Sequence, residues 1–382
     1  MQYLINRMLK YFLVNVFLVV CLLKADAQLT PEYQKSSPAG TVFGICANYG
    51  TTVVHTPAVK PIGGARPYGF GFEYSKQAND SATYHLCSAF PRVGLQLQYF
   101  HYGTPILGNS YMASYFIQPV YRLSNRFNFF YRASVGICYS DNPFNPNSKI
   151  DTLNQNYSLW INPYLQVTSG FGLRLSQYLS LDASGEFNHI SNGNVKRPNR
   201  GLNWLTASLS LVYKPNGSAL PKYHRVHDKY WSNRSWNYTI GAMYVAKQDY
   251  AGFMAAYQRL YAVGGFVEGS KQIGRIHAFV TGVQAYYNDL KIDAPNGAVP
   301  YSPLKHSSVL AGVYVGHEFL MGRFILSQII GGYITPHPAM YTNLFHQHSL
   351  RYLIDRHWQA GFGLKAHESD ADFICLNALY RL

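Results

Sequence analysis

A histidine and a serine stand two positions apart near the end of a segment of alternating polarity, at His189 and Ser191. Successive side chains of a β-strand point to opposite faces, so these two share one face. An imidazole beside a hydroxyl suits ester cleavage, with the imidazole as base and the hydroxyl as nucleophile. The pair therefore predicts an ester hydrolase site. The alternative is two buried polar groups with local hydrogen-bond partners.

The stretch around the pair, residues 181–205, contains an alternating strand, a polar loop and a returning strand. The other side chains on the face of the pair are Leu181, Ala183, Gly185 and Phe187. The loop is rich in Asn, Gly, Pro and basic residues, and Asn203 on the returning strand faces the same way as the pair. In a soluble protein an apolar strand face lies in the core, whereas in an outer-membrane barrel it contacts lipid. The fold class therefore decides whether the pair is exposed to lipid.

The composition favours a membrane barrel. The chain has 382 residues with 33 Tyr and 22 Phe, and only 13% of the residues are charged. Aromatic girdles at both interfaces of a membrane barrel draw heavily on Tyr and Trp. Beyond the N-terminal segment we find no apolar run of about 18 residues, so we expect no transmembrane helix. Residence in a membrane must then come from strands.

The N-terminus predicts export. Residues 1–27 resemble a secretory signal, in which Arg7 and Lys10 precede an apolar run and Ala25-Asp26-Ala27 forms the small-x-small cleavage pattern. The formal net charge of +14 suggests an anionic partner such as a phosphorylated lipid, although a solvated basic surface is the alternative. Export disfavours nucleic acid as the partner.

Strand-like stretches separated by turn signals recur along the chain. In the first half they lie at about 41–54, 66–77, 83–102, 109–122, 126–140, 157–175, 178–191 and 202–213. In the second half they lie at about 234–247, 252–270, 274–289, 306–318, 321–335, 341–354, 357–367 and 371–382. Residues 158–175 keep an apolar period of two, and strands of that length are ordinary in tilted barrel walls.

These stretches predict an all-β fold, an antiparallel outer-membrane β-barrel of about 16 strands in two halves. Residues 28–214 form the half with the His-Ser pair, residues 215–233 a linker rich in Pro, Gly and basic residues, and residues 234–382 the second half. Strand number alone does not distinguish one wide barrel from two eight-stranded units.

Other candidate sites carry weaker signals. His367 and Ser369 repeat the His-x-Ser spacing, but His367 falls on the face opposite to the apolar one, so we expect it to be non-catalytic. His346 and His348 lack further ligands nearby, and a metal site needs three or four, so we expect no metal and no cofactor. The four cysteines beyond the signal contain no CxxC pair, and we expect small buried or lipid-facing residues before a disulfide.

Residues 189–193 (His-Ile-Ser-Asn-Gly) and 198–203 (Pro-Asn-Arg-Gly-Leu-Asn) together resemble the signature of the lipid A 3-O-deacylase (PagL-type) or acyloxyacyl hydrolase family. The family motif is His-x-Ser-Asn followed by Pro-Asn-x-Gly, with a carboxylate in the next strand. The preceding strands fit the family layout, so the resemblance covers about residues 40–214.

The resemblance implies an outer-membrane barrel esterase that removes a fatty acyl chain from lipid A of lipopolysaccharide. Ser191 would be the nucleophile and His189 the general base, with Asn192 and Gly193 at the oxyanion hole. Asn203 stands where the family has its carboxylate. An asparagine can still accept a hydrogen bond from the imidazole, but it cannot stabilise an imidazolium by charge.

Three basic residues of the same loop, Lys196, Arg197 and Arg200, are candidates to bind lipid A phosphates through charge-assisted contacts. Two other functions remain open at this point. Asn203 and the large second half favour a non-enzymatic barrel, either a pore or an envelope-structural protein. Similar Ser-His-Asn chemistry on glycerophospholipids would make the protein an outer-membrane phospholipase.

Overall fold

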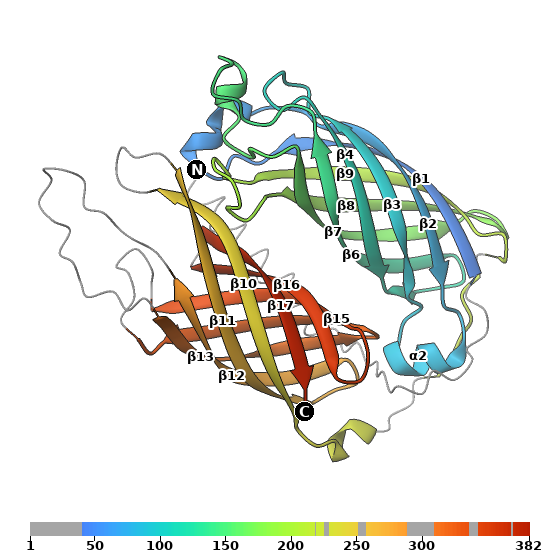
Figure 1. The fold of residues 1–382 in the computed structure, drawn as a ribbon. Helices are drawn as coiled ribbons and strands as arrows, with labels where there is room; N and C mark the ends of the chain where they lie inside the picture. The colour runs from blue at the N-terminus through green and yellow to red at the C-terminus, as the bar shows by residue number, and fades with distance from the viewer. Residues whose placement is uncertain are drawn as a thin grey trace, which may run out of the picture.

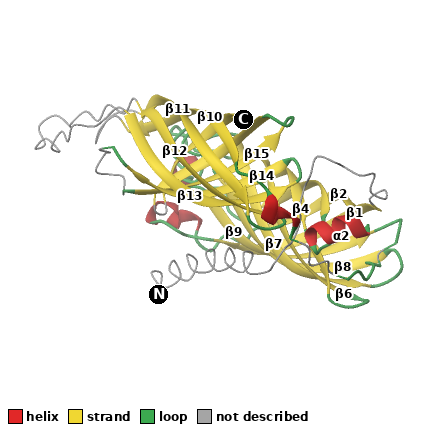
Figure 2. Cartoon of the chain, turned by 90° about the horizontal axis from the view of Figure 1, so that it is seen from below, coloured by secondary structure: helices red, strands yellow, loops and turns green. Residues whose placement is uncertain are grey.

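A computed structural model describes residues 40–217, 219–224, 229–250, 257–288, 309–335, 343–367 and 370–382. Strands make up most of it, with a few short helices at the ends of the strands (Figure 2). Within these residues no helix is long and apolar enough to cross a membrane. The predicted signal at residues 1–27 lies outside the described residues.

The first barrel is built from residues 40–213 (Figure 1). Its strands are β1 Gly40–Thr52, β2 Tyr68–Gln77, β3 Arg92–His101, β4 Asn109–Gln118, β5 Val120–Arg122, β6 Phe127–Ser140, β7 Ile161–Arg174, β8 Leu179–Ile190 and β9 Leu202–Tyr213. Its helices are η1 Pro57–Ile62, α2 Ser81–Cys87 and η2 Asp151–Leu153. The strand order is β4-β3-β2-β1-β9-β8-β7-β6-β5, and pairing of β4 with β6 closes the sheet.

Strands β4 and β5 form one wall strand of this barrel. Both pair with β6, and only Pro119 separates them. A proline has no N–H to give to a sheet, so the ladder is interrupted there and resumes at Val120. Counted this way, the first barrel has eight wall strands.

The second barrel follows a connecting segment that contains the short helix η3 Tyr230–Asn233. Its strands are β10 Asn237–Tyr250, β11 Tyr257–Gln272, β12 His277–Asn288, β13 Val309–Met321, β14 Phe324–Tyr333, β15 Leu344–Leu353, β16 Trp358–His367 and β17 Asp370–Arg381. Each pairs with its neighbour in sequence, and β17 closes on β10. The predicted all-β antiparallel barrel fold is confirmed, as two eight-stranded barrels rather than one wide barrel.

Most predicted strands lie within a few residues of the observed ones, but two began too early. The stretch 83–102 is a helix followed by a strand, because Asp80 caps α2 by accepting a hydrogen bond from the Thr83 N–H and β3 starts only at Arg92. The stretch 157–175 starts as a loop. Tyr157 is buried there and donates to the Leu107 carbonyl, so β7 begins at Ile161.

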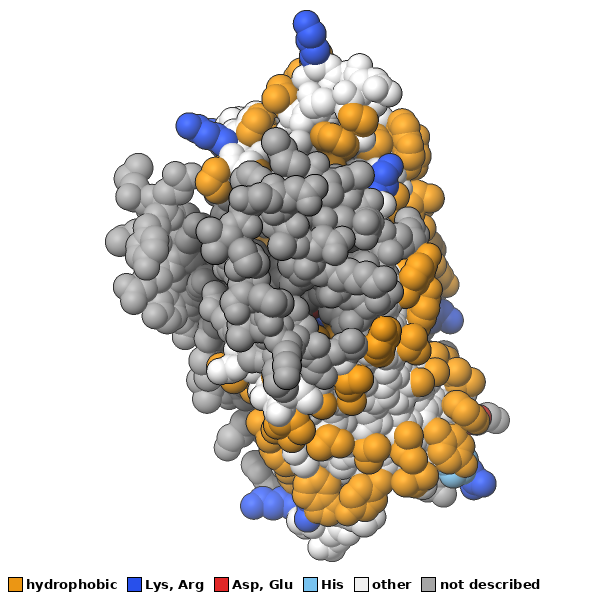
Figure 3. Space-filling view, turned by 60° about the vertical axis from the view of Figure 1, so that its left-hand side comes forward, with side chains coloured by type: hydrophobic (Ala, Val, Ile, Leu, Met, Phe, Trp, Pro, Cys, Tyr) orange, Lys and Arg blue, Asp and Glu red, His pale blue; other side chains and the backbone are white. Residues whose placement is uncertain are grey.

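The barrel walls are apolar outside and polar inside, the reverse of a soluble protein. Strand β7 shows the alternation: Ile161 and Phe171 are 59% and 57% exposed, whereas Asn162 and Gln166 are buried. Hydrophobic side chains gather over the outer surface in Figure 3. This alternation, with Asn and Gln inside the barrel and Ile and Phe outside, is typical of strands that face hydrocarbon.

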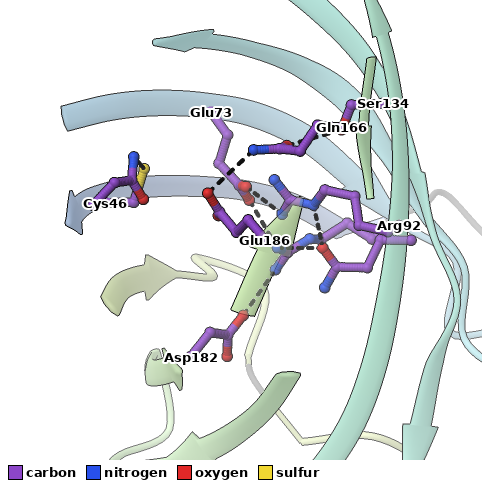
Figure 4. Close-up of polar contacts among 10 residues, drawn as sticks. Cys46, Glu73, Arg92, Ser134, Gln166, Asp182 and Glu186 are labelled. Carbon is purple, nitrogen blue, oxygen red and sulfur yellow. Dashed lines mark hydrogen bonds and ion pairs between the residues drawn. The ribbon is translucent and has the colours of Figure 1, made fainter. Parts of the chain in front are cut away.

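The interior of the first barrel holds a network of buried charges (Figure 4). Glu73 accepts from Arg132 at 2.6 Å and lies 3.0 Å from Arg92, which in turn approaches Asp182 at 3.7 Å. Arg132 also donates to Gln118 and lies over the Phe116 ring. Buried charges are tolerated only when they are paired and hydrogen-bonded, and here strands from opposite sides of the lumen supply the partners.

The cysteines in the described residues form no disulfide. Cys138 and Cys375 are buried, and Cys46 and Cys87 are partly buried. This agrees with the first of the two expectations, small residues without a bridge.

We expect Arg132→Ala to lower the free energy of unfolding of the first barrel by about 3 kcal/mol, because it leaves Glu73 with one cation instead of two. Urea unfolding in detergent micelles, followed by the gel shift between folded and unfolded barrel, measures this. Arg126→Ala, at an exposed turn, is the control and should change little. Equal stability of both variants would contradict a stabilising role for the network.

Candidate active site

The loop that joins β8 to β9, residues 191–201, carries most of the predicted site and is called the motif loop below. It lies at the same end of the first barrel as the connections 53–67 and 141–160. The opposite end has the short turns 123–126 and 175–178 and one longer connection, 78–91, which contains α2. In outer-membrane barrels the longer loops are extracellular and the short turns periplasmic, so the motif loop belongs to the extracellular end.

His189 lies on the outer face of the wall, near this end. It pairs with Leu165 on β7 and with Asn203 on β9, and both of these face outward as well. Leu165 is 40% exposed, whereas Asn188 beside His189 is fully buried inside the barrel. The predicted common face of His189 and Asn203 is therefore observed, and it is the face that contacts lipid.

A chain of hydrogen bonds runs from His189 through Asn203 and His55 back to the motif loop at Arg200. His189 Nδ1 lies 2.6 Å from Asn203 Oδ1, and Asn203 Nδ2 lies 3.2 Å from His55 Nδ1. His55 Nε2 lies 2.8 Å from the Arg200 carbonyl. Since an amide oxygen only accepts, His189 Nδ1 carries the proton and Nε2 keeps its lone pair. The chain thus fixes the tautomer in which Nε2 can act as a base.

Ser191 is held by donors from its own loop. Its Oγ accepts from Asn199 Nδ2 at 2.9 Å and from the Gly193 N–H at 3.2 Å. Among the hydrogen bonds of the described residues, none joins Ser191 to His189. The backbone makes this geometry possible, because Gly193 has φ +57°, in the left-handed region that favours glycine.

Asn192 supports these donors. Its N–H donates to Asn199 Oδ1 at 2.9 Å, which turns the amide N–H₂ of Asn199 toward Ser191. Its own side chain donates to the Lys196 carbonyl at 2.8 Å, and this closes the motif loop on itself. Ser158 donates to the same carbonyl from the neighbouring loop.

The motif loop rests on a second loop and on an apolar cluster. The N–H groups of Arg200 and Gly201 donate to the carbonyls of Gln155 and Asn156 in the loop 141–160. The residues that flank the motif loop, Ile190 and Leu202, are fully buried. They belong to a cluster that also contains Phe100, Tyr102, Tyr164 and Trp204. The motif loop is therefore held by the packing of its flanking residues in the apolar cluster and by hydrogen bonds to the loop 141–160.

The three predicted phosphate ligands lie in different surroundings. Lys196 and Arg200 are exposed. Arg197 contacts the second barrel instead: its Nε donates to the Gln248 carbonyl at 3.0 Å, and its N–H donates to Gln248 Oε1 at 3.1 Å.

The other His positions do not form a comparable group. His367 is buried, with Nε2 2.8 Å from the Tyr333 hydroxyl, and Ser369 lies outside the described residues. His346 and His348 contact each other at 3.2 Å. Within the described parts of the chain no three His, Cys, Asp or Glu residues gather as metal ligands would.

Sequence reasoning missed His55 and Asn199 as site residues. His55 comes from the loop after β1, and no periodic pattern links it to β9. Asn199 was visible only as part of the motif. Together the group offers a hydroxyl, two N–H donors directed at it and an imidazole whose Nε2 has no hydrogen bond to the described part of the chain. A hydroxyl, N–H donors and a base are the parts that acyl transfer needs.

Two protein-family models match the chain. The model described as lipid A 3-O-deacylase (PagL) matches residues 68–212, and the model described as acyloxyacyl hydrolase, C-terminal domain, matches residues 234–382. The first match covers β2 to β9 of the first barrel, without β1, and the second match covers the second barrel. No curated protein matches the chain.

Solved structures of outer-membrane barrels are similar to parts of the chain. Neisserial surface protein A (NspA) is 14% identical, and the match covers 47% of this chain and 99% of that chain with a TM-score of 0.34. The outer membrane enzyme PagL is 14% identical, and the match covers 44% of this chain and 97% of that chain with a TM-score of 0.32.

Proposed function

Since the chain belongs to the lipid A 3-O-deacylase (PagL) family, we propose that it removes a fatty acyl chain from lipid A, with Ser191 as nucleophile and His189 as general base. It is an ester hydrolase of the outer membrane. The proposal is supported by one observation above others: Ser191 Oγ accepts from two N–H donors in the motif loop, directly after the strand that carries His189 on its outer face, and Asn203 holds the Nδ1 of that histidine.

The location suits a substrate that is itself a membrane lipid. The extracellular end of the barrel lies in the outer leaflet, where lipopolysaccharide resides. A lipid-facing Ser191 lets the acyl chain stay in hydrocarbon while its ester reaches the hydroxyl. The exposed Lys196 and Arg200 are then available for the phosphates of lipid A. Arg197 holds the loop against the second barrel through its backbone N–H and its Nε.

In the acylation step Ser191 Oγ attacks the ester carbonyl while His189 Nε2 takes its proton. This needs a rotation of the Ser191 side chain toward His189. The tetrahedral intermediate collapses, the bond to the sugar oxygen breaks, and His189 returns the proton to that oxygen. The products are a free sugar hydroxyl and an acyl-enzyme ester on Ser191.

Deacylation repeats the sequence with water. His189 takes a proton from the water as its oxygen attacks the acyl carbon, and the proton then returns to Ser191 Oγ as the fatty acid leaves. In both steps negative charge develops on the carbonyl oxygen. The Gly193 N–H and Asn199 Nδ2 are the donors we assign to it, because both already converge on Ser191. Asn192, whose N–H is bound to Asn199, positions these donors.

Asn203 takes the place of the carboxylate in the family motif. It fixes the tautomer of His189 through a neutral hydrogen bond, so the imidazolium gains no charge partner. His55 completes this arrangement by accepting from the Asn203 amide, which keeps Oδ1 directed at His189. We assign His55 as a positioning residue.

We expect Ser191→Ala to abolish acyl release, because no other hydroxyl is placed between the two donors. Mass spectrometry of lipid A from cells that express each variant measures the loss of one acyl mass. Ser169→Ala, an exposed serine on the same outer wall in β7, is the matched control and should remain active.

Acyl release by a folded Ser191→Ala barrel would refute Ser191 as nucleophile. If the wild type releases fatty acid from glycerophospholipid but not from lipid A, the substrate assignment is wrong and the enzyme is a phospholipase.

We expect His55→Phe to lower kcat about tenfold with little change in KM, because it keeps the ring volume but removes the hydrogen bond that orients Asn203 and the one to the Arg200 carbonyl. Initial rates with purified protein and lipid A in mixed micelles measure both constants. His224→Phe, in the connecting segment, is the control. An unchanged kcat would show that Asn203 needs no support from His55.

A further inference from the structure

The motif loop contacts the second barrel through Asn194. The Gln248 N–H on β10 donates to the Asn194 carbonyl at 2.6 Å. The Asn194 side-chain amide donates to two carbonyls on β17, those of Ala371 at 2.8 Å and Asp372 at 3.0 Å. One residue of the first barrel is therefore bonded to both strands that close the second barrel.

The ladder that closes the second barrel stops short of the ends of its two strands. The β10–β17 ladder runs from Thr239 paired with Arg381 to Val245 paired with Cys375. Beyond Val245, β10 continues to pair with β11, and β17 continues to pair with β16. Beyond that point β10 and β17 no longer pair with each other. Asn194 supplies a carbonyl acceptor to β10 and amide donors to β17. Backbone groups at a sheet edge need such partners.

The ends of the two strands are nevertheless tied together inside the second barrel. Lys247 on β10 and Asp372 on β17 form a buried ion pair at 2.5 Å. Lys247 precedes Gln248, whose N–H donates to Asn194, and the Asp372 carbonyl accepts from Asn194. The gap that receives Asn194 is therefore defined by fixed groups on both sides.

A second contact involves the residue that donates to Ser191. A Cβ on Gly193 would lie 2.2 Å from Ile374 Cγ1, so the Gly193 backbone packs directly against the Ile374 side chain on the outer face of β17. Arg197 bonds to Gln248 on the other side of Asn194. The second barrel thus contacts the motif loop at Gly193, Asn194 and Arg197.

We propose that the second barrel completes the active site of the first, with Asn194 and Ile374 as positioning residues that hold the Gly193 N–H against Ser191. This rests on the proposed function. The two barrels then form one enzyme, and the second does not act as a separate pore. Its contribution is to the geometry of the oxyanion donors, so it affects kcat more than KM.

The test uses Ile374→Trp in the full chain, a change made wholly in the second barrel. The larger side chain has no room beside Gly193 and displaces its N–H from Ser191. We expect kcat for acyl release to fall about 100-fold, the cost of a displacement near 1 Å, while KM changes less than about threefold. Leu376→Trp, at the next outward position of β17 and 62% exposed, is the matched control and should keep wild-type kcat.

A second variant tests Asn194 without a change of size. Asn194→Asp keeps the shape and tolerates the left-handed backbone at φ +63°, but it turns a donor into an acceptor that faces two carbonyls. We expect the same selective fall in kcat. Asn147→Asp, in the exposed part of the loop 141–160, is the control for added charge at this end of the barrel.

The outcomes separate this inference from the proposed function. If the wild type is active and Ser191→Ala is not, but Ile374→Trp and Asn194→Asp keep wild-type kcat, the role of the second barrel is refuted and the deacylase stands. If Leu376→Trp loses activity equally, the effect is general destabilisation and the inference is also overturned. If the wild type releases no acyl chain, or Ser191→Ala still does, the proposed function fails first.

Discussion

Closure of each sheet on itself is the constraint on which the rest of the structure depends. In hydrocarbon no water is present to pair with a free N–H or carbonyl, so a strand wall must end where it began. The first barrel closes β4 on β6 and the second closes β10 on β17. Closure also divides the side chains of each strand into two sets, because alternate residues face the lipid or the lumen. The same sorting places Glu73, Arg92 and Arg132 in one buried network and His189 on the outer wall.

Most of this was readable from the sequence, because a period of two extends over whole strands. The alternation predicted the strands and placed His189, Ser191 and Asn203 on one face. It failed where apolar residues without a clear period precede a strand, as at 81–87, since the Asp80 cap favours a helix there. His55 and Ile374 could not be found in this way. Their contacts with Asn203 and Gly193 join loops and barrels that are distant in sequence, and no local pattern encodes such a contact.

The proposed base and the proposed nucleophile of the site lie on different kinds of element. The proposed base His189 and the Asn203 amide bonded to it lie on regular strands, where the ladder fixes one opposite the other. The proposed nucleophile Ser191 and its two N–H donors lie in the motif loop, which contacts the loop 141–160 and the second barrel and is closed on itself by Asn192. Loops are intrinsically more mobile than the strands they join. A loop that must hold donors within hydrogen-bond distance of a reacting atom therefore needs support from outside, and here that support is extensive.

This division explains how the proposed active site can lack the carboxylate of the family motif. A charged partner would strengthen the imidazolium of His189, but on a lipid-facing wall it would also bring an additional charge out of water, which is costly without its own partners. Asn203 avoids that cost and still sets the tautomer, provided that its amide cannot turn over and present N–H₂ to His189. His55 prevents the turn by accepting from that N–H₂. A neutral triad of this kind depends less on charge and more on fixed orientation, and that orientation comes from the loop after β1, the loop before β7 and the strand β17.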